Sequence, residues 1–73
     1  MFMDWDNSEE IVEMLKAKYP DLNPIDIAFP KLLEMIIGLE GFTGKAEGNL
    51  EGKMERIIEL WYEEWQYTHG KKD

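Results

Sequence analysis

With 73 residues, the chain is long enough for one small domain and leaves no room for a second. Sixteen acidic residues against eight basic ones give a formal net charge of -8, which disfavours binding to nucleic acid and to anionic membrane surfaces. The sequence contains no cysteine, which excludes a disulfide framework and a thiolate-ligated metal or cluster site.

The charge leaves two interpretations open, one functional and one not. Cations and basic protein patches are the natural partners of such a chain, but acidity can also serve solubility alone.

No apolar run approaches the roughly 20 residues of a membrane-spanning helix, and the first six residues are acidic where a secretory signal is basic. We therefore expect a soluble, cytoplasmic, monomeric protein.

The first predicted element is a helix over about Ser8–Lys18. Asn7, followed three residues later by Glu10, fits a capping box at the start of this helix. Glu9, Glu10 and Glu13 are expected to face solvent. Apolar residues at helical spacing predict the opposite, buried face, which carries Ile11, Val12 and Leu15.

Two prolines four residues apart, Pro20 and Pro24, predict a rigid joint after this helix. Pro20 ends the helix because it lacks an amide hydrogen and disfavours helical geometry at Tyr19. Between the prolines, Asp21 and Asn23 can hydrogen-bond to their own backbone, which favours a fixed turn over a mobile linker. We expect this joint to set the angle between the flanking helices.

Ile25–Phe29 alternates apolar and polar residues, but one short strand without a partner cannot form a sheet. We predict an extended connector that packs Ile27 and Phe29 onto the helices. Pro30 suits the first position of a second helix, over about Pro30–Leu39. Apolar residues cover most of the circumference of this helix, so it is expected to be the central and most buried one.

Glu40–Asn49 contains three glycines and no periodic pattern, so it is predicted to be a loop, with Phe42 packed on the core. These glycines do not match a phosphate-binding loop. The clearest helical pattern follows, over about Leu50–Tyr67, and its apolar face includes Trp61, the side chain whose truncation we expect to cost most. A ridge of carboxylates is expected to face solvent on the opposite side: Glu55, Glu59 and Glu63.

These elements predict an all-α fold, a small three-helix domain over residues 1–67 with little or no sheet, followed by a disordered tail over residues 68–73.

His69 lies in that tail without a second ligand at helical spacing, so it is not expected to bind metal. The sequence around Ser8 and Thr43 does not support a nucleophilic triad. We therefore do not expect an enzyme. The feature that remains is a set of exposed carboxylates around the first helix and the joint: Glu9, Glu10, Glu13, Asp21 and Asp26.

Trp5 to Pro24 carries the pattern W-x-x-S-x-E-I-x-E-x-L-x-x-x-Y-P-D-L-x-P. Ten further positions belong with it: Ile27, Phe29, Ile36, Leu39, Glu40, Phe42, Glu55, Ile57, Trp61 and Glu64. In these residues the chain resembles the IscX family, small acidic proteins of bacterial iron-sulfur cluster assembly. The resemblance extends without a gap from about Trp5 to Glu64.

The resemblance implies a small helical fold described as a modified winged helix. It also implies an accessory protein that binds the cysteine desulfurase through an acidic surface, binds iron weakly, and competes with frataxin to modulate cluster assembly. The acidic positions that match the family are Glu10, Glu13, Asp21, Glu40, Glu55 and Glu64. From exposure and charge we predict a partner-binding surface made of Glu9, Glu10, Glu13, Asp21, Asp26 and Glu40.

The chain departs from the family in the loop after the second helix. Gly41, Gly44, Lys45 and Ala46 stand where the family has an acidic loop. A hard cation needs several converging oxygen ligands, so an iron site in this loop should be lost. Weak Fe²⁺ binding would then fall to a diffuse site near Glu9, Glu10 and Asp21, and no tightly bound cofactor is expected.

Two other functions are compatible with the sequence. A winged-helix fold would allow nucleic-acid binding, which the negative charge opposes by repelling the phosphate backbone. An acidic inhibitor or decoy could occupy a basic site on an unrelated protein, and composition alone does not separate it from the accessory role.

Overall fold

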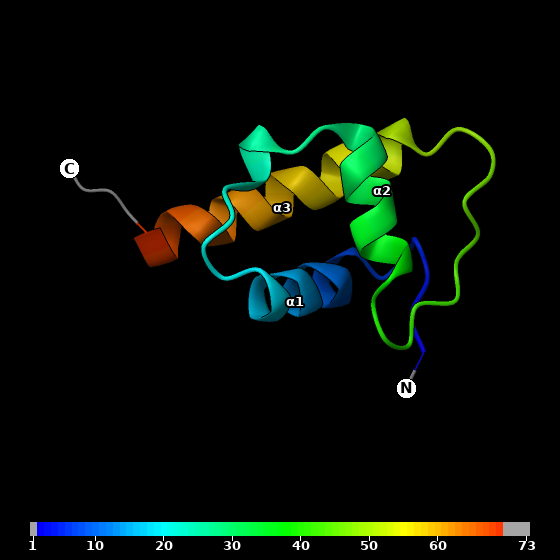
Figure 1. The fold of residues 1–73 in the computed structure, drawn as a ribbon, viewed down its shortest axis with the longest axis horizontal. Helices are drawn as coiled ribbons and strands as arrows, with labels where there is room; N and C mark the ends of the chain where they lie inside the picture. Colours follow the sequence, from blue (N-terminus) through cyan, green and yellow to red (C-terminus); the bar gives the residue numbers. More distant parts are fainter. Residues whose placement is uncertain (1, 70–73) are drawn as a thin grey trace.

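Three α-helices and one short 3₁₀ turn form the architecture of residues 2–69, which are the residues that the computed structural model describes (Figure 1). In chain order they are α1 (Ser8–Lys18), η1 (Pro24–Asp26), α2 (Phe29–Ile37) and α3 (Glu51–His69). Within this part of the chain there is no β-strand, and one isolated bridge pairs Met3 with Phe42. The predicted all-α class is confirmed, whereas the winged-helix detail is not.

Helix α1 has the bounds that the sequence predicts. The amide of Tyr19 donates to the carbonyl oxygen of Leu15 at 2.8 Å, and this is the last bond of the helix because Pro20 has no amide hydrogen. The start of α1 differs from the prediction. The side chain of Asn7 makes no cap and instead accepts a hydrogen bond from the amide of Asp4 at 2.8 Å.

The capping box predicted for Asn7 and Glu10 is therefore wrong. The turn that precedes α1 has taken the carboxamide oxygen that the cap would need, since Asn7 also donates its own amide to the carbonyl of Asp4 at 2.9 Å. Glu10 is consequently free of a capping role and is exposed on the surface of α1.

The joint after α1 closes through Asn23, whose Oδ1 accepts a hydrogen bond from the amide of Ile25 at 3.1 Å. This bond confirms the predicted side-chain turn and caps η1. The prediction of an extended connector over Ile25–Phe29 is wrong at its start, because Pro24–Asp26 forms the 3₁₀ turn η1. This turn leaves Ile25 57% exposed. Ile27 and Phe29 pack against the core as predicted.

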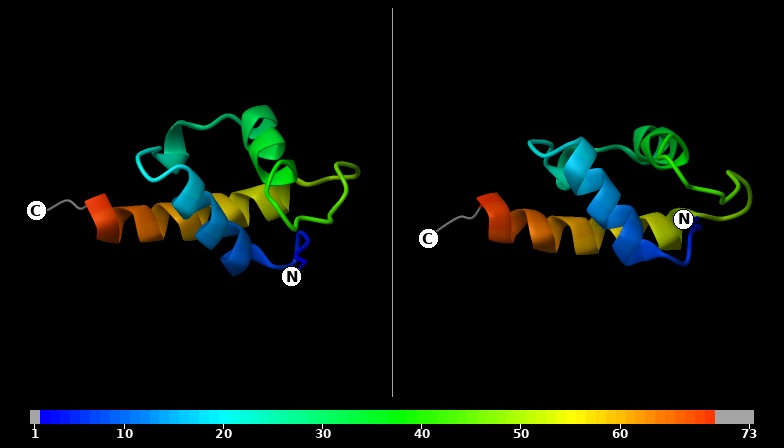
Figure 2. Two further views of the ribbon diagram at one scale, coloured as in Figure 1. Left: turned by 60° about the horizontal axis from the view of Figure 1, so that its bottom comes forward. Right: turned by 90° about the horizontal axis from the view of Figure 1, so that it is seen from below.

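The core lies between the three helices and the N-terminal segment (Figure 2). Trp61, 1% exposed, is the largest fully buried side chain, as expected for the clearest apolar face in the sequence. The buried apolar residues are Met3, Trp5, Ile11, Val12, Leu15, Leu32, Met35, Ile36, Leu39, Met54, Ile57 and Trp61.

The central helix is α3 and not α2, which corrects one part of the prediction from apolar content. The other part is confirmed, because three of the nine residues of α2 are buried, a larger share than three of 11 in α1 or three of 19 in α3. With 19 residues α3 is long enough to contact α1, α2 and η1, whereas the nine-residue α2 crosses only one end of it (Figure 1). Ile37 of α2 is accordingly 42% exposed. Helix α3 also continues through Thr68 and His69, the first two residues of the predicted tail; residues 70–73 of that tail lie outside the described residues.

The N-terminal segment lies beside the loop that follows α2 (Figures 1 and 2). The amide of Met3 donates to the carbonyl of Gly41 at 2.9 Å, and the amide of Thr43 donates to the carbonyl of Met3 at 2.8 Å. Trp5 Nε1 donates to the carbonyl of Lys45 at 2.8 Å. These bonds join segments about 40 residues apart and bury Met3 and Trp5, which the sequence does not predict.

Phe42 packs on the core as predicted, edge-on to Trp5 with 5.0 Å between ring centroids. Gly44 makes room for this aromatic pair. A Cβ atom at Gly44 would lie 2.6 Å from Cζ of Phe42 and 2.8 Å from Cδ1 of Trp5. The loop therefore needs glycine at this position for packing reasons.

Candidate functional site

Every carboxylate predicted to contact a partner is exposed: Glu9, Glu10, Glu13, Asp21, Asp26 and Glu40. Helix α1 presents Glu9 and Glu10 in its first turn and Glu13 one turn later, because its apolar residues are turned towards α3 and the core. The exposure of the set agrees with the prediction, but the fold divides it among three places.

The first place is a groove of about 310 Å³ between α1 and α3. Both helices contribute carboxylates to its lining, and each also contributes one aliphatic side chain. We call it the acidic groove, and it is lined by Glu9, Val12, Glu13, Leu60, Glu63 and Glu64. A groove with this lining can attract lysine and arginine side chains of a partner.

Lys16 joins the two walls of the acidic groove. Its Nζ lies 2.9 Å from Oε1 of Glu64 on α3 and 3.3 Å from Oε2 of Glu13 on α1. The hydrogen bond to Glu64, helped by the contact with Glu13, raises the pKa of Lys16 above its usual value, against the partial burial that would lower it. Glu9 and Glu63 make no ion pair within residues 2–69.

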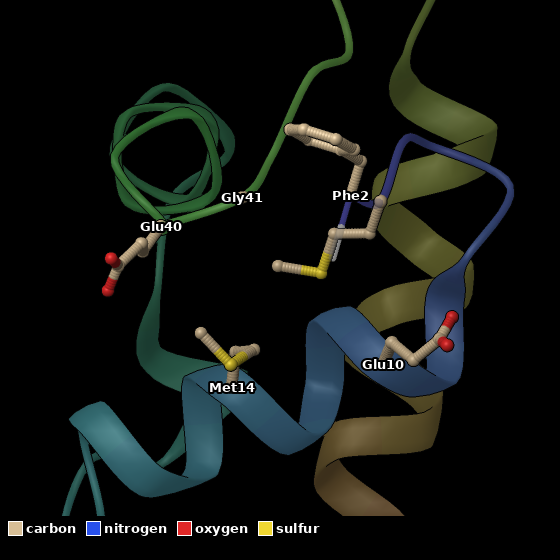
Figure 3. Close-up of a pocket in the computed structure, with 6 residues that line it drawn as sticks. Phe2, Glu10, Met14, Glu40 and Gly41 are labelled. Atoms are coloured by element: carbon tan, nitrogen blue, oxygen red, sulfur yellow. The ribbon is translucent and has the colours of Figure 1, made fainter.

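Glu10 and Glu40 line a second hollow, on a different face of α1 (Figure 3). On α1, Glu10 and Met14 form one row and Glu9 and Glu13 another, because successive residues of a helix are rotated by about 100°. Besides Glu10 and Glu40, the residues that line this hollow are Phe2, Met3, Met14 and Gly41.

Asp21 and Asp26 occupy the third place, at the joint beyond the C-terminal end of α1. The length of α1 separates Asp21 from Glu9 and Glu10 by about 14 Å along the helix axis. The three candidate iron ligands therefore do not converge. No group of three or more histidine or acidic side chains in residues 2–69 lies close enough together to hold a metal ion.

The chemistry of a ferrous site therefore does not fit the described residues, since a hard cation requires several oxygen ligands around one point. Weak iron binding remains a prediction of the sequence resemblance.

Glu63 and Glu64 are the functional candidates that the sequence does not place beside α1. The sequence does indicate a special position for Glu64, because it follows Ile57 by seven residues and Trp61 by three and so lies at the edge of the buried face of α3. A carboxylate at the edge of a buried helix face lies next to the helix that packs against that face. Which helix that is cannot be derived from the period alone.

The hydropathy of the helices and a comparison with protein families also bear on function. In residues 2–69 no helix combines the length and the hydropathy that crossing a membrane requires. A protein-family model described as iron-sulphur cluster assembly matches residues 3–66. The matched region includes the N-terminal segment, the acidic groove and the loop after α2.

Proposed function

The chain belongs to the iron-sulphur cluster assembly family, and from this membership we propose that it is a non-enzymatic accessory protein that docks on a cysteine desulfurase and modulates its activity. Membership of this family indicates a role in iron-sulphur cluster assembly. The cysteine desulfurase is proposed as the partner because the sequence resembles the IscX family, and the exposed acidic surface supports that choice of partner.

The observation that carries the proposal is the acidic groove. Two helices contribute four carboxylates to it. Within residues 2–69, Lys16 pairs with Glu13 and Glu64, whereas Glu9 and Glu63 make no ion pair and are available to a partner. On a chain with a formal net charge of -8, such a surface attracts a basic patch and orients it during the encounter.

The lining of the groove also supports binding over catalysis. It consists of carboxylates and aliphatic side chains, which supply attraction and contact area but no nucleophile paired with a base. We infer that any effect on the desulfurase arises from occupying its surface. The proposal does not require iron, because the carboxylates of the groove act as charges for a basic patch and not as a cation cage.

The experiment is titration calorimetry of the desulfurase from the same organism with the unmodified chain and two charge-reversed variants. We expect micromolar-range affinity that weakens as salt is raised, because the attraction between exposed charges is screened. The variant Glu9→Lys with Glu13→Lys reverses one wall of the groove and should weaken binding by about tenfold or more.

The matched control is Glu34→Lys with Glu47→Lys, which changes the net charge by the same amount at two exposed carboxylates outside the groove. It should bind nearly as well as the unmodified chain. Equal weakening by both variants would indicate a net-charge effect and contradict the groove as the docking surface. No binding at low salt would contradict the proposed function itself.

A further inference from the structure

The hollow lined by Glu10 and Glu40 differs from the acidic groove because its walls are mainly apolar. It measures about 480 Å³ and lies between the N-terminal segment, α1 and the residues that follow α2 (Figure 3). We call it the apolar hollow, and its lining residues are Phe2, Met3, Glu10, Met14, Glu40 and Gly41.

Two large apolar side chains are exposed at this one place. Phe2 is 79% exposed and Met14 is 37% exposed. Figure 3 shows the side chain of Met14 rising from α1 and the ring of Phe2 lying across the hollow, next to Gly41. Single exposed apolar residues are common on protein surfaces, but neighbouring ones around a hollow indicate an interaction site.

The fold holds the apolar hollow in shape. Met3, 7% exposed, is bonded through its amide to Gly41 and through its carbonyl to Thr43, so the backbone that carries Phe2 is tied to the loop after α2. These hydrogen bonds therefore hold the backbone next to Phe2 in place. Methionine adds an adaptable apolar surface, because its unbranched side chain can adjust to the shape of a partner.

Glu10 and Glu40 give the apolar hollow its electrostatic character. They come from α1 and from the residues after α2, and in Figure 3 they lie on opposite sides of the hollow. Neither carboxylate makes an ion pair within residues 2–69. An apolar centre with a carboxylate on each side is complementary to an apolar side chain with basic neighbours.

We propose that the apolar hollow anchors a segment of the desulfurase in which a bulky apolar side chain is flanked by lysine or arginine. The apolar side chain inserts between Phe2 and Met14, and its basic neighbours pair with Glu10 and Glu40. This inference rests on the proposed function and adds to it an apolar anchor beside the acidic groove. A buried apolar anchor contributes most of the affinity in many interfaces, whereas rim charges contribute to rate and orientation.

A second apolar hollow, near the start of α3, does not have the same complementarity. Residues from α2, the following loop and α3 line it, and among the described residues Glu51 is its single carboxylate. Met54 is among its lining residues and serves below as an internal reference. With one carboxylate, this hollow has no acidic pair to match basic residues on both sides of an anchor.

The first test compares the affinity of single substitutions for the desulfurase at low and at high salt. Phe2→Gln and Met14→Gln remove the apolar contacts and keep the net charge, and each should weaken binding by about tenfold. This loss should persist at high salt, since ions screen charges but do not weaken apolar contact. Ile25→Gln is the matched control, because Ile25 is 57% exposed and lies outside the apolar hollow.

The second test follows the methyl signals of the methionines by NMR as unlabelled desulfurase is added. The signal of Met14 should shift or broaden at substoichiometric desulfurase, while that of Met54 keeps its position. Movement of the Met54 signal with Met14 unchanged would overturn the proposal in favour of the second hollow.

The two tests separate the possible failures. If Phe2→Gln and Met14→Gln bind like the unmodified chain while reversal of the acidic groove abolishes binding, the anchor is wrong and the proposed function stands. If the unmodified chain does not bind the desulfurase at low salt, both proposals are overturned. A loss of affinity for Ile25→Gln equal to that for Phe2→Gln would also overturn the anchor, because it would show no preference for the hollow.

Discussion

Trp5 Nε1 donates a hydrogen bond to the backbone carbonyl of Lys45, 2.8 Å away and 40 residues later in the chain. The indole is 8% exposed, and its ring lies against Phe42 and over Gly44. Lys45 belongs to the loop that follows α2, where Glu47 is the only acidic residue among positions 41–49. In this chain that loop is a structural element, held closed by the N-terminal segment.

The close packing at Gly44 predicts that Gly44→Ala destabilises the protein. The added Cβ would lie within 3 Å of atoms of both Phe42 and Trp5, so the aromatic pair must move. We expect a loss of about 1–3 kcal/mol in the free energy of unfolding, measured by urea denaturation. Gly52→Ala is the control, because a Cβ there meets nothing within 4 Å, and it should stabilise α3 by about 0.5 kcal/mol. Changes of the same sign for the two variants would contradict the packing described for Gly44.

Truncation of Trp61 is expected to be the most damaging change in α3. The side chain is 1% exposed, and Trp61→Ala should lower the free energy of unfolding by about 3–5 kcal/mol, a large part of the total for a domain of this size. The milder Trp61→Phe should remain folded and lie between Trp61→Ala and the unmodified chain in thermal unfolding. Tyr67→Ala, at a residue that is 84% exposed, should change stability by less than about 0.5 kcal/mol. Equal effects at Trp61 and Tyr67 would refute the assignment of the core.

The ion pair of Lys16 predicts a pH dependence of stability. Because the folded-state pKa of Lys16 is raised above the usual 10.5, chiefly by the hydrogen bond to Glu64, the stabilisation is fully present below pH 10.5. It is lost as the pH rises through the raised folded-state pKa. Lys16→Met should therefore be less stable than the unmodified chain at neutral pH and low salt, by about 0.5 kcal/mol, and the difference should shrink above pH 10.5.

Urea denaturation across this pH range measures the effect of Lys16. The control is Lys31→Met, which removes the same charge from an exposed lysine that makes no ion pair within the described residues. A stability difference for Lys16→Met that stays constant above pH 10.5 would show that it arises from packing of the aliphatic stem and not from the charge.

Iron binding is expected to be weak and separate from docking. Glu47 is the only acidic side chain in residues 41–49, Lys45 adds a positive charge there, and the described carboxylates form no cluster able to hold a metal. In an anaerobic titration with ferrous iron, the amides of residues 41–49 should show no saturable NMR shifts at micromolar iron. Desulfurase affinity should be the same with and without a chelator. Saturable shifts of those amides would refute the expectation.

Local sequence determines the helices and their buried faces. The period of Ile11 and Leu15 predicts the buried face of α1 and Pro20 predicts its end, because spacing along a helix and a missing amide hydrogen act within a few residues. The apolar face that contains Trp61 predicts the buried side of α3 for the same reason. The family could likewise be inferred from residues, because its pattern over Trp5 to Pro24 is contiguous.

Only the tertiary structure decided which segments meet. The burial of Met3 and Trp5 depends on pairing with a loop about 40 residues away, and no local period encodes such a pairing. The same holds for the candidate sites. Glu9 and Glu64 share a groove because α1 packs across α3, and Phe2 and Met14 share a hollow because the bonds of Met3 to the loop after α2 carry the N-terminal segment past α1.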